Sequence, residues 1–214
     1  MKKILYYVNQ FFGQIGGEDK ADYKPHFEKP IGCAQAFDKA LVGGEVVGTV
    51  VCGDNYYNEH KEESDKFILD VFEKVKPDIV VAGPAFNAGR YGMACSGVIN
   101  LLKDKDIPLV TGMYIENPAV DMCRLHSYII ETIKEMATLT NKIIEGKNLS
   151  PKEDNYLAQG RRLTEFSDKI GARRAVEMLL KRFNEEEFET ELPMPEFDEV
   201  EPAAPIADMS KATI

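Results

Sequence analysis

Four short apolar runs, each followed by a loop rich in glycine and asparagine, constrain the fold of this chain more than any other feature. They cover residues 3–8, 46–52, 78–82 and 107–110. Apolar side chains occupy consecutive positions in these runs, and valine and isoleucine are frequent, which is typical of strands buried on both faces. Strands of that kind belong to parallel sheets covered by helices. The runs therefore predict a parallel β-sheet between two layers of helices.

Stretches with helical periodicity lie between these runs. Residues 61–75 carry one apolar stripe and stop before Pro77, while residues 89–103 and, more weakly, residues 32–41 show a similar pattern. Alternation of strands and helices at this spacing is typical of βαβ units. We therefore expect residues 1–146 to form a Rossmann-like α/β domain, a doubly wound, mostly parallel sheet with helices on both faces.

The last third of the chain predicts helices and then an extended tail. Residues 117–145 show helical spacing after Pro118 and predict one long helix that ends at Gly146. Residues 147–183 are expected to be a helical extension that packs on the first domain, with a basic amphipathic helix over 171–183. Residues 184–214 hold ten acidic residues and one lysine, which is −9 of the net charge of −10, and predict an acidic, proline-rich linker or arm.

Composition excludes several classes of function. The chain has no basic stripe for a nucleic-acid backbone and no apolar run of the roughly 18–20 residues that a membrane span requires. Its N-terminus lacks the pattern of a signal peptide, so we expect a cytoplasmic protein. The four cysteines form no Cys-x-x-Cys pair and the three histidines are scattered, which gives no support for a metal site or a disulfide framework.

Ligands of open parallel sheets bind beyond the carboxyl ends of the strands. That rule selects the loops at residues 9–17, 52–58, 83–92 and 111–118. The strongest candidate contains Asn87, Gly89, Arg90 and Tyr91, because a helix start offers free N–H groups and an arginine fork can hold a carboxylate in two hydrogen bonds. The alternative is that Arg90 pairs with a structural acid and the glycines permit a tight turn.

The other loop residues allow two interpretations each. Asp54 and Glu116 suit a general base or a polar anchor, but also a helix cap or a turn. Cys52, at a strand end, is either a thiolate or, more simply, a buried inert cysteine. Gly16 and Gly17 are not followed by a phosphate-loop motif. The residues alone predict an α/β domain that binds a small anion.

Read together, these loops resemble one family, over the whole chain from Met1 to Ile214. The resemblance is carried by Val8–Phe12 with Gly16–Asp22, Cys52–Tyr56, Gly83–Gly92, Thr111–Tyr114 with Glu116–Pro118, and Leu192–Pro195 with Phe197 and Asp198. The chain is similar to the selenoprotein (gamma) subunit of component B of the glycine, sarcosine and betaine reductases. This resemblance implies an oxidoreductase subunit that helps to cleave the C–N bond of a small amino acid, with a disulfide as acceptor.

The resemblance also implies partners and cofactors. The partners are pyruvoyl-bearing subunits of component B and the selenoprotein component A; the cofactors are a selenocysteine and a pyruvoyl group. The family subunit is about twice as long and carries its selenocysteine in a second half with a motif of the UxxCxxC type. This sequence has neither selenocysteine nor Cys-x-x-Cys. We therefore expect an N-terminal domain that holds no catalytic residue or cofactor of its own and is inactive when isolated.

Strand-end placement and resemblance together give each loop residue a role. Arg90, with the amides around Asn87 and Gly89, would hold the substrate carboxylate or an acid of a partner. The polar wall would consist of Asp54, Asn55, Glu116 and Asn117. Aromatic side chains would shape the site: Phe11, Phe12, Phe86, Tyr91 and Tyr114. The alternative is an assembly module without substrate contact, in which the same loops dock the pyruvoyl subunits and the aromatic side chains anchor that interface.

Overall fold

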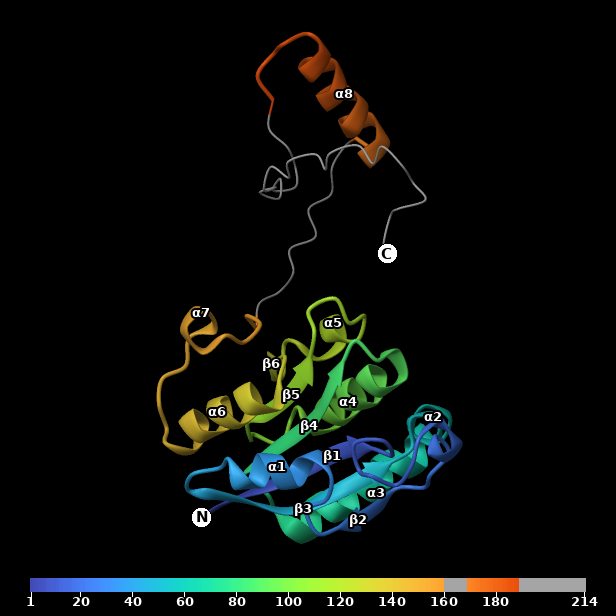
Figure 1. Ribbon diagram of the computed structural model, residues 1–214, viewed down its shortest axis with the longest axis vertical. Coiled ribbons are helices and arrows are strands. Elements are labelled where there is room, and N and C mark those ends of the chain that lie inside the picture. Colours follow the sequence, from blue (N-terminus) through green and yellow to red (C-terminus); the bar gives the residue numbers. More distant parts are fainter. Residues whose placement is uncertain (160–168, 189–214) are drawn as a thin grey trace, which may run out of the picture. The chain divides into compact units, whose positions relative to one another are not determined.

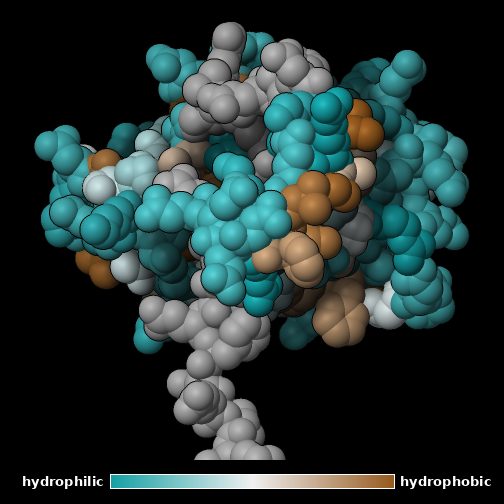
Figure 2. Space-filling view, turned by 90° about the horizontal axis from the view of Figure 1, so that it is seen from above, coloured by the Kyte–Doolittle hydropathy of each residue, from teal (hydrophilic) through white to brown (hydrophobic). Residues whose placement is uncertain are grey.

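The computed structural model of the chain describes residues 1–159 and 169–188 (Figure 1). The chain divides into two compact units, Met1–Arg162 and Leu163–Ile214. None of the helices in the described ranges is long and apolar enough to cross a membrane. On the face seen in Figure 2, hydrophobic side chains form small groups among hydrophilic ones.

The first unit is built on a six-stranded sheet with the order β2-β3-β1-β4-β5-β6 (Figure 1). The parallel strands are β1 (Lys2–Asn9), β3 (Gly44–Cys52), β4 (Ile79–Phe86), β5 (Leu109–Met113) and β6 (Tyr128–Ile130). At one edge, β2 (His26–Glu28) pairs antiparallel with β3. All four apolar runs lie in or overlap parallel strands, which confirms the mostly parallel sheet. The two short strands β2 and β6 were not predicted.

Helices cover both faces of the sheet. On one face α1 (Cys33–Lys39) and α6 (Ile133–Ile144) pack on Ile4, Tyr6 and Val8 of β1. Leu5 and Tyr7 point to the opposite face. That face is covered by α2 (Asp54–Glu59), α3 (Lys61–Val75), α4 (Gly89–Leu102) and α5 (Val120–Cys123). Side chains alternate between the faces of a strand, so β1 contributes to both cores, and the expected doubly wound arrangement is confirmed.

The single helix expected over residues 117–145 is wrong. The chain forms α5, then β6, and only then α6. β6 pairs with β5, so tertiary pairing overrides the helical spacing of this stretch. Thr132 then starts α6 with a capping box, in which its hydroxyl accepts from the Glu135 N–H. Gly146 follows the helix with a φ of +67°, consistent with the predicted helix end.

The region expected to be a helical extension contains two helices. The first, α7 (Pro151–Asp154), is followed by Leu157, whose N–H donates to the Ile129 carbonyl at 2.8 Å. The second unit contains α8 (Gly171–Phe183), which has the predicted bounds. Whether this extension packs on the first domain stays a prediction. Residues 160–168 of it, and the expected acidic arm from residue 189 onward, lie outside the described residues.

Candidate functional site

The four predicted loops meet at the carboxyl edge of the sheet, where the strand order reverses. From β1 the chain runs to β3 on one side and then returns to β4 on the other. The loops after β1 and β4 therefore diverge, and this point is where doubly wound sheets bind ligands. Hydrogen bonds join the loops: Asn58 Nδ2 donates to the carbonyls of Asp54 (2.7 Å) and Arg90 (3.1 Å).

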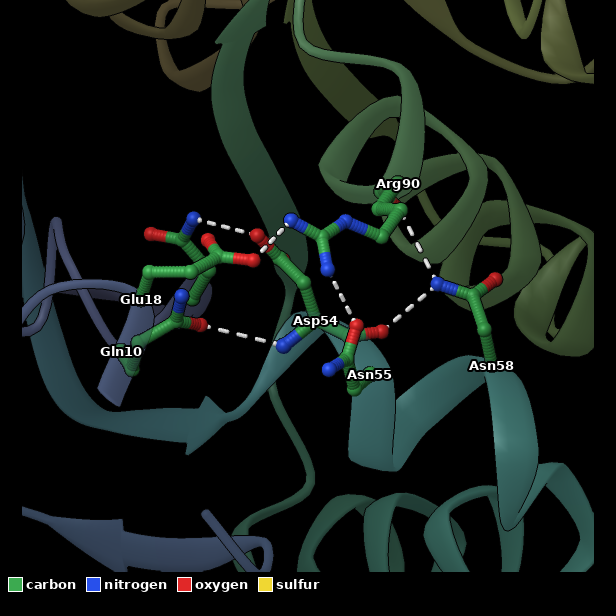
Figure 3. Close-up of polar contacts among 7 residues, drawn as sticks. Gln10, Glu18, Asp54, Asn55, Asn58 and Arg90 are labelled. Carbon is green, nitrogen blue, oxygen red and sulfur yellow. Dashed lines mark hydrogen bonds and ion pairs between the residues drawn. The ribbon is translucent and has the colours of Figure 1, made fainter. Parts of the chain in front are cut away.

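Arg90 belongs to an exposed layer of this edge, which we call the outer group, together with Glu18 and Asn55 (Figure 3). One guanidinium nitrogen of Arg90 donates to Asn55 Oδ1 and the other to Glu18 Oε1. The side chains of Arg90 and Glu18 are 50% and 69% exposed. Exposed ion pairs of this kind are weak and screened by salt. Arg90 thus pairs with an acid of the chain, as in the alternative interpretation of this residue, and the exposure of the pair makes the contact weak.

Asp54 lies next to the outer group but is buried, with only 8% of its surface exposed. Its Oδ2 accepts from Asn9 Nδ2 and its backbone N–H donates to Gln10 Oε1, both at 3.0 Å (Figure 3). Its Oδ1 is buried without a partner. Desolvation raises the pKa of this carboxyl above its ordinary value, against the lowering effects of the Asn9 hydrogen bond and the Arg90 charge.

Two tyrosines complete a buried layer with Asp54, which we call the inner group. Tyr7 of β1 and Tyr91 of α4 are almost fully buried, and their hydroxyls have only the thiols of Cys52 and Cys95 nearby, with no well-formed hydrogen bond. Burial raises the pKa of both hydroxyls; the Asp54 charge adds to the shift of Tyr7, and Tyr7 adds to that of Tyr91. An unsatisfied buried polar atom costs about 1–3 kcal/mol. The inner group is therefore an expensive arrangement for the fold.

The remaining predicted residues have different placements. Asn117 is buried and structural: its Nδ2 donates to the carbonyls of Phe86 (2.9 Å) and Ala88 (3.3 Å), and thereby fixes the loop before α4. Asn87 is exposed in that loop, and Gly89 is exposed as the first residue of α4. Glu116 is also exposed and makes no hydrogen bond or ion pair within the residues that the structure describes. Of the four residues of the predicted polar wall, Asp54 and Asn55 lie beside Arg90, whereas Asn117 supports a loop and Glu116 bonds to neither.

Aromatic side chains extend along the same edge. Phe12 stacks on Tyr91 with ring centroids 5.7 Å apart, and it also contacts Phe11 and Phe86. Tyr114 lies edge-on to Phe86 at 5.5 Å. The five predicted aromatic residues thus form one continuous group, as expected for a wall of the site.

Four participants of the site were not predicted from the sequence. Asn9 and Gln10 position Asp54, Glu18 pairs with Arg90, and Asn58 joins two loops. Asn9 and Gln10 carried a usable signal, because two polar residues at the end of a buried apolar strand require hydrogen-bond partners. The pairing of Glu18 with Arg90, 72 positions away, has no local signal.

The cysteines are packing residues. Cys52 is fully buried, and burial raises the pKa of its thiol to about 12. Burial also raises the pKa of Cys33 to about 11 and those of Cys95 and Cys123 above the ordinary value. All four are free thiols. Because the thiolate is the reactive form, the interpretation of Cys52 as a buried inert residue is supported.

Fold and site together define a class: a doubly wound α/β domain with a charged polar site at the switch point of its sheet. The profile of the family described as "Glycine/sarcosine/betaine reductase selenoprotein B (GRDB)" matches residues 1–214. The chain belongs to this family, which confirms the resemblance found in the sequence. No solved structure matches it.

Curated relatives extend this result. The chain is 48% identical to the glycine reductase complex component B subunit gamma of Carboxydothermus hydrogenoformans, over 99% of this chain and 52% of the relative. It is 43% identical to the betaine and sarcosine reductase complex component B subunits beta of Peptoclostridium acidaminophilum, over 100% and 99% of this chain and 52% of each relative. The chain therefore spans about half the length of these relatives.

Proposed function

We propose that this chain provides the substrate-side domain of an amino-acid reductase component B, which reductively cleaves the C–N bond of glycine, sarcosine or betaine. Family membership over the whole chain supports this assignment. The observation that carries it is the Arg90 fork, which holds the Glu18 carboxylate at the switch point of the sheet. Since a side-chain carboxylate fits there, the carboxylate of a small amino acid fits as well.

Binding of the substrate carboxylate takes place by exchange with Glu18. Asn55 keeps its hydrogen bond to one guanidinium nitrogen of Arg90 and so holds the group in place. At the other nitrogen the substrate carboxylate replaces the Glu18 carboxylate. The N-terminus of α4 assists, because Ala88 at the N-cap supplies no side-chain hydrogen bond to the first-turn N–H groups. At Gly89 an added Cβ would meet nothing within 4 Å, so this part of the backbone is open to a ligand.

Redox chemistry is proposed for groups outside this chain. The sequence contains no selenocysteine, and burial disfavours the thiolate of each cysteine. Selenocysteine and pyruvoyl groups on other polypeptide are proposed to supply it, with pyruvoyl-bearing subunits and the selenoprotein component A as partners. The isolated chain is accordingly inactive: with component A, glycine, phosphate and a dithiol it yields no acetyl phosphate.

The carboxylate clamp is tested by calorimetric titration of acetate and glycine into three forms of the chain. Arg90→Lys keeps the charge and loses the fork, so both affinities should fall about tenfold. The matched control is Lys105→Gln, which breaks another exposed pair, with Glu73 at 2.8 Å, and should leave both affinities unchanged. Equal affinities in wild type and Arg90→Lys would refute the clamp.

A second candidate function is favoured by the exposed apolar side chains at the same edge. Phe11 is 63% and Ile115 is 60% exposed, and Tyr114 is partly exposed. These side chains fit an assembly module that docks the pyruvoyl subunits of the complex. The same calorimeter separates the two functions: heat from glycine supports substrate binding, and heat from the partner subunit alone supports docking.

A further inference from the structure

Helix α8 (Figure 1) carries an exposed row of apolar side chains, which we call the stripe. The stripe consists of Val176, Leu179, Leu180 and Phe183. These positions are three or four residues apart, so they share one face of the helix, and each is between 54% and 83% exposed. A helix of 13 residues is marginal in water by itself, because most helical stability in proteins comes from the packing of an apolar face. The stripe therefore requires a partner surface.

The stripe is symmetrical along the helix. Its midpoint lies between Leu179 and Leu180, and Val176 and Phe183 are equally far from that midpoint in the sequence. A second α8 that runs antiparallel therefore brings Leu179 of one copy to Leu180 of the other, and Val176 of one copy to Phe183 of the other. A two-fold dimer needs such a surface, one that is complementary to itself.

The charges at the two ends of α8 complement each other in the same arrangement. The first turn holds Arg173 and no acidic residue, and three exposed glutamates, Glu185–Glu187, follow the C-terminus. The dipole of their own helix disfavours both, and Lys181 and Arg182 of the last turn offset the three glutamates only in part. In an antiparallel pair Arg173 lies opposite Glu186 of the second copy, because both positions are equally far from the midpoint.

Arg173 and Glu186 are placed to make this contact. Arg173 is 70% exposed, and its pair with Glu177 at 3.3 Å is of the exposed kind that contributes little. The Glu186 N–H donates to the Lys181 carbonyl at 2.9 Å, which keeps Glu186 against the end of the helix. The two charges therefore flank the stripe, one at each end.

We propose that two copies of this chain form a dimer in which their α8 helices pack antiparallel through the stripe, with Arg173 of each copy paired to Glu186 of the other. The interface is isologous, so it closes at two copies. Helices of this length, about 20 Å, bury less than the about 1,200–2,000 Å² of a standard stable complex. The dimer is therefore weak and forms at roughly 10–100 µM. This inference does not depend on the carboxylate clamp.

Sedimentation velocity of the whole chain, at roughly 1–200 µM, tests the proposal. The wild type should shift from 24.0 kDa towards twice that mass as its concentration rises. Leu180→Glu places a charge at the centre of the stripe and should stay at 24.0 kDa throughout. The matched control is Val42→Glu, which adds the same charge at a side chain that is 65% exposed outside α8 and should dimerise like the wild type.

A charge swap tests the antiparallel arrangement itself. Arg173→Glu places an acid opposite Glu186 at both ends of the interface and should weaken the dimer about tenfold. The double variant Arg173→Glu with Glu186→Arg restores the pair with reversed signs, so it should recover the affinity of the wild type. Recovery requires that the two positions meet across the interface.

Three results would overturn the inference. A wild-type chain that stays monomeric up to roughly 200 µM would mean that another part of the chain or a different protein covers the stripe. A dimer that persists in Leu180→Glu would place the interface elsewhere. A charge swap that restores nothing would contradict the antiparallel pairing. Circular dichroism shows whether Leu180→Glu keeps its helices, and the charge swap decides if it does not, since neither of its substitutions lies in the stripe.

Discussion

Asp54 and Asp78 are aspartates at opposite ends of the same parallel sheet. Asp78 precedes β4 at the amino edge, and both of its oxygens have partners at 2.8 Å, the Lys2 ammonium and the Lys3 N–H. These hydrogen bonds hold its pKa below the ordinary value. Asp54 follows β3 at the carboxyl edge, where one oxygen has no partner and burial raises its pKa.

The comparison shows that one residue type has two roles in this fold. At Asp78 the surroundings favour the charged form, so the ionised side chain stabilises the folded state. At Asp54 the surroundings oppose the charged form, and the fold retains a carboxylate that it does not need for stability. Costly polar groups of this kind concentrate at functional sites. The amino edge of the sheet is therefore satisfied by its own hydrogen bonds, and the contrast supports the proposal that a ligand binds at the carboxyl edge.

The largest effect is expected from a substitution that moves the backbone next to Asp54. Gly53 precedes Asp54, and a Cβ added to it would lie 2.1 Å from the Ala21 carbonyl oxygen. Gly53→Ala should lower the free energy of unfolding by roughly 3 kcal/mol, since backbone must shift to remove the clash. Urea denaturation measures the change.

Gly89→Ala is the matched control for Gly53→Ala, because its new Cβ meets nothing within 4 Å. Alanine favours a helix start more than glycine does, so this variant should be neutral or stabilised by up to about 1 kcal/mol. Equal destabilisation of the two variants would mean that the close approach at Gly53 does not hold Asp54 in place.

A smaller effect compares the two aspartates directly. At neutral pH Asp54→Asn removes a charge that burial disfavours and should raise the free energy of unfolding by about 1 kcal/mol. Asp78→Asn removes a satisfied charge beside Lys2 and should lower it by less than about 1 kcal/mol. Urea denaturation of both variants at pH 7 tests the opposite signs.

The pH dependence of the two differences sharpens the comparison. The folded-state pKa of Asp54 is raised, so its contribution to stability is fully present below the unfolded-state pKa and is lost as the pH rises through the folded value. The folded-state pKa of Asp78 is lowered, so its contribution is present above the unfolded-state pKa and is lost as the pH falls through the folded value. Acidification should therefore reduce the difference in free energy of unfolding between wild type and each of the two Asp→Asn variants. A difference that persists at low pH for Asp54→Asn would contradict a charge effect.

The sequence predicted those parts of the molecule that depend on local patterns. The apolar runs identified four parallel strands, and the strand-end rule brought Asp54, Asn55 and Arg90 to one edge. The rule could not separate Asn117, which supports a loop, from residues that face a ligand, because both follow strands. The division of residues 117–145 was missed because β6 is only three residues long and depends on pairing with β5.

The contacts that define the site depend on long-range geometry. Glu18 reaches Arg90 because the loop after β1 folds back over the sheet edge, and no periodicity specifies that path. The missing partner of Asp54 Oδ1 is a property of the packed structure, which no residue pattern indicates. The acidic, proline-rich arm expected after position 188 stays a prediction.

The most direct test of the account is the NMR titration of the Asp54 side-chain carboxyl, with ¹³C-labelled aspartate, in the free chain and with saturating glycine. In the free chain the account predicts a pKa above the ordinary 3.8, with Asp78 below it in the same spectra. Glycine should lower the pKa of Asp54, because a zwitterion without net charge replaces the Glu18 carboxylate, whose charge raises that pKa, and it should leave the pKa of Asp78 unchanged. An Asp54 pKa that is the same with and without saturating glycine would contradict the proposal that glycine binds beside Asp54.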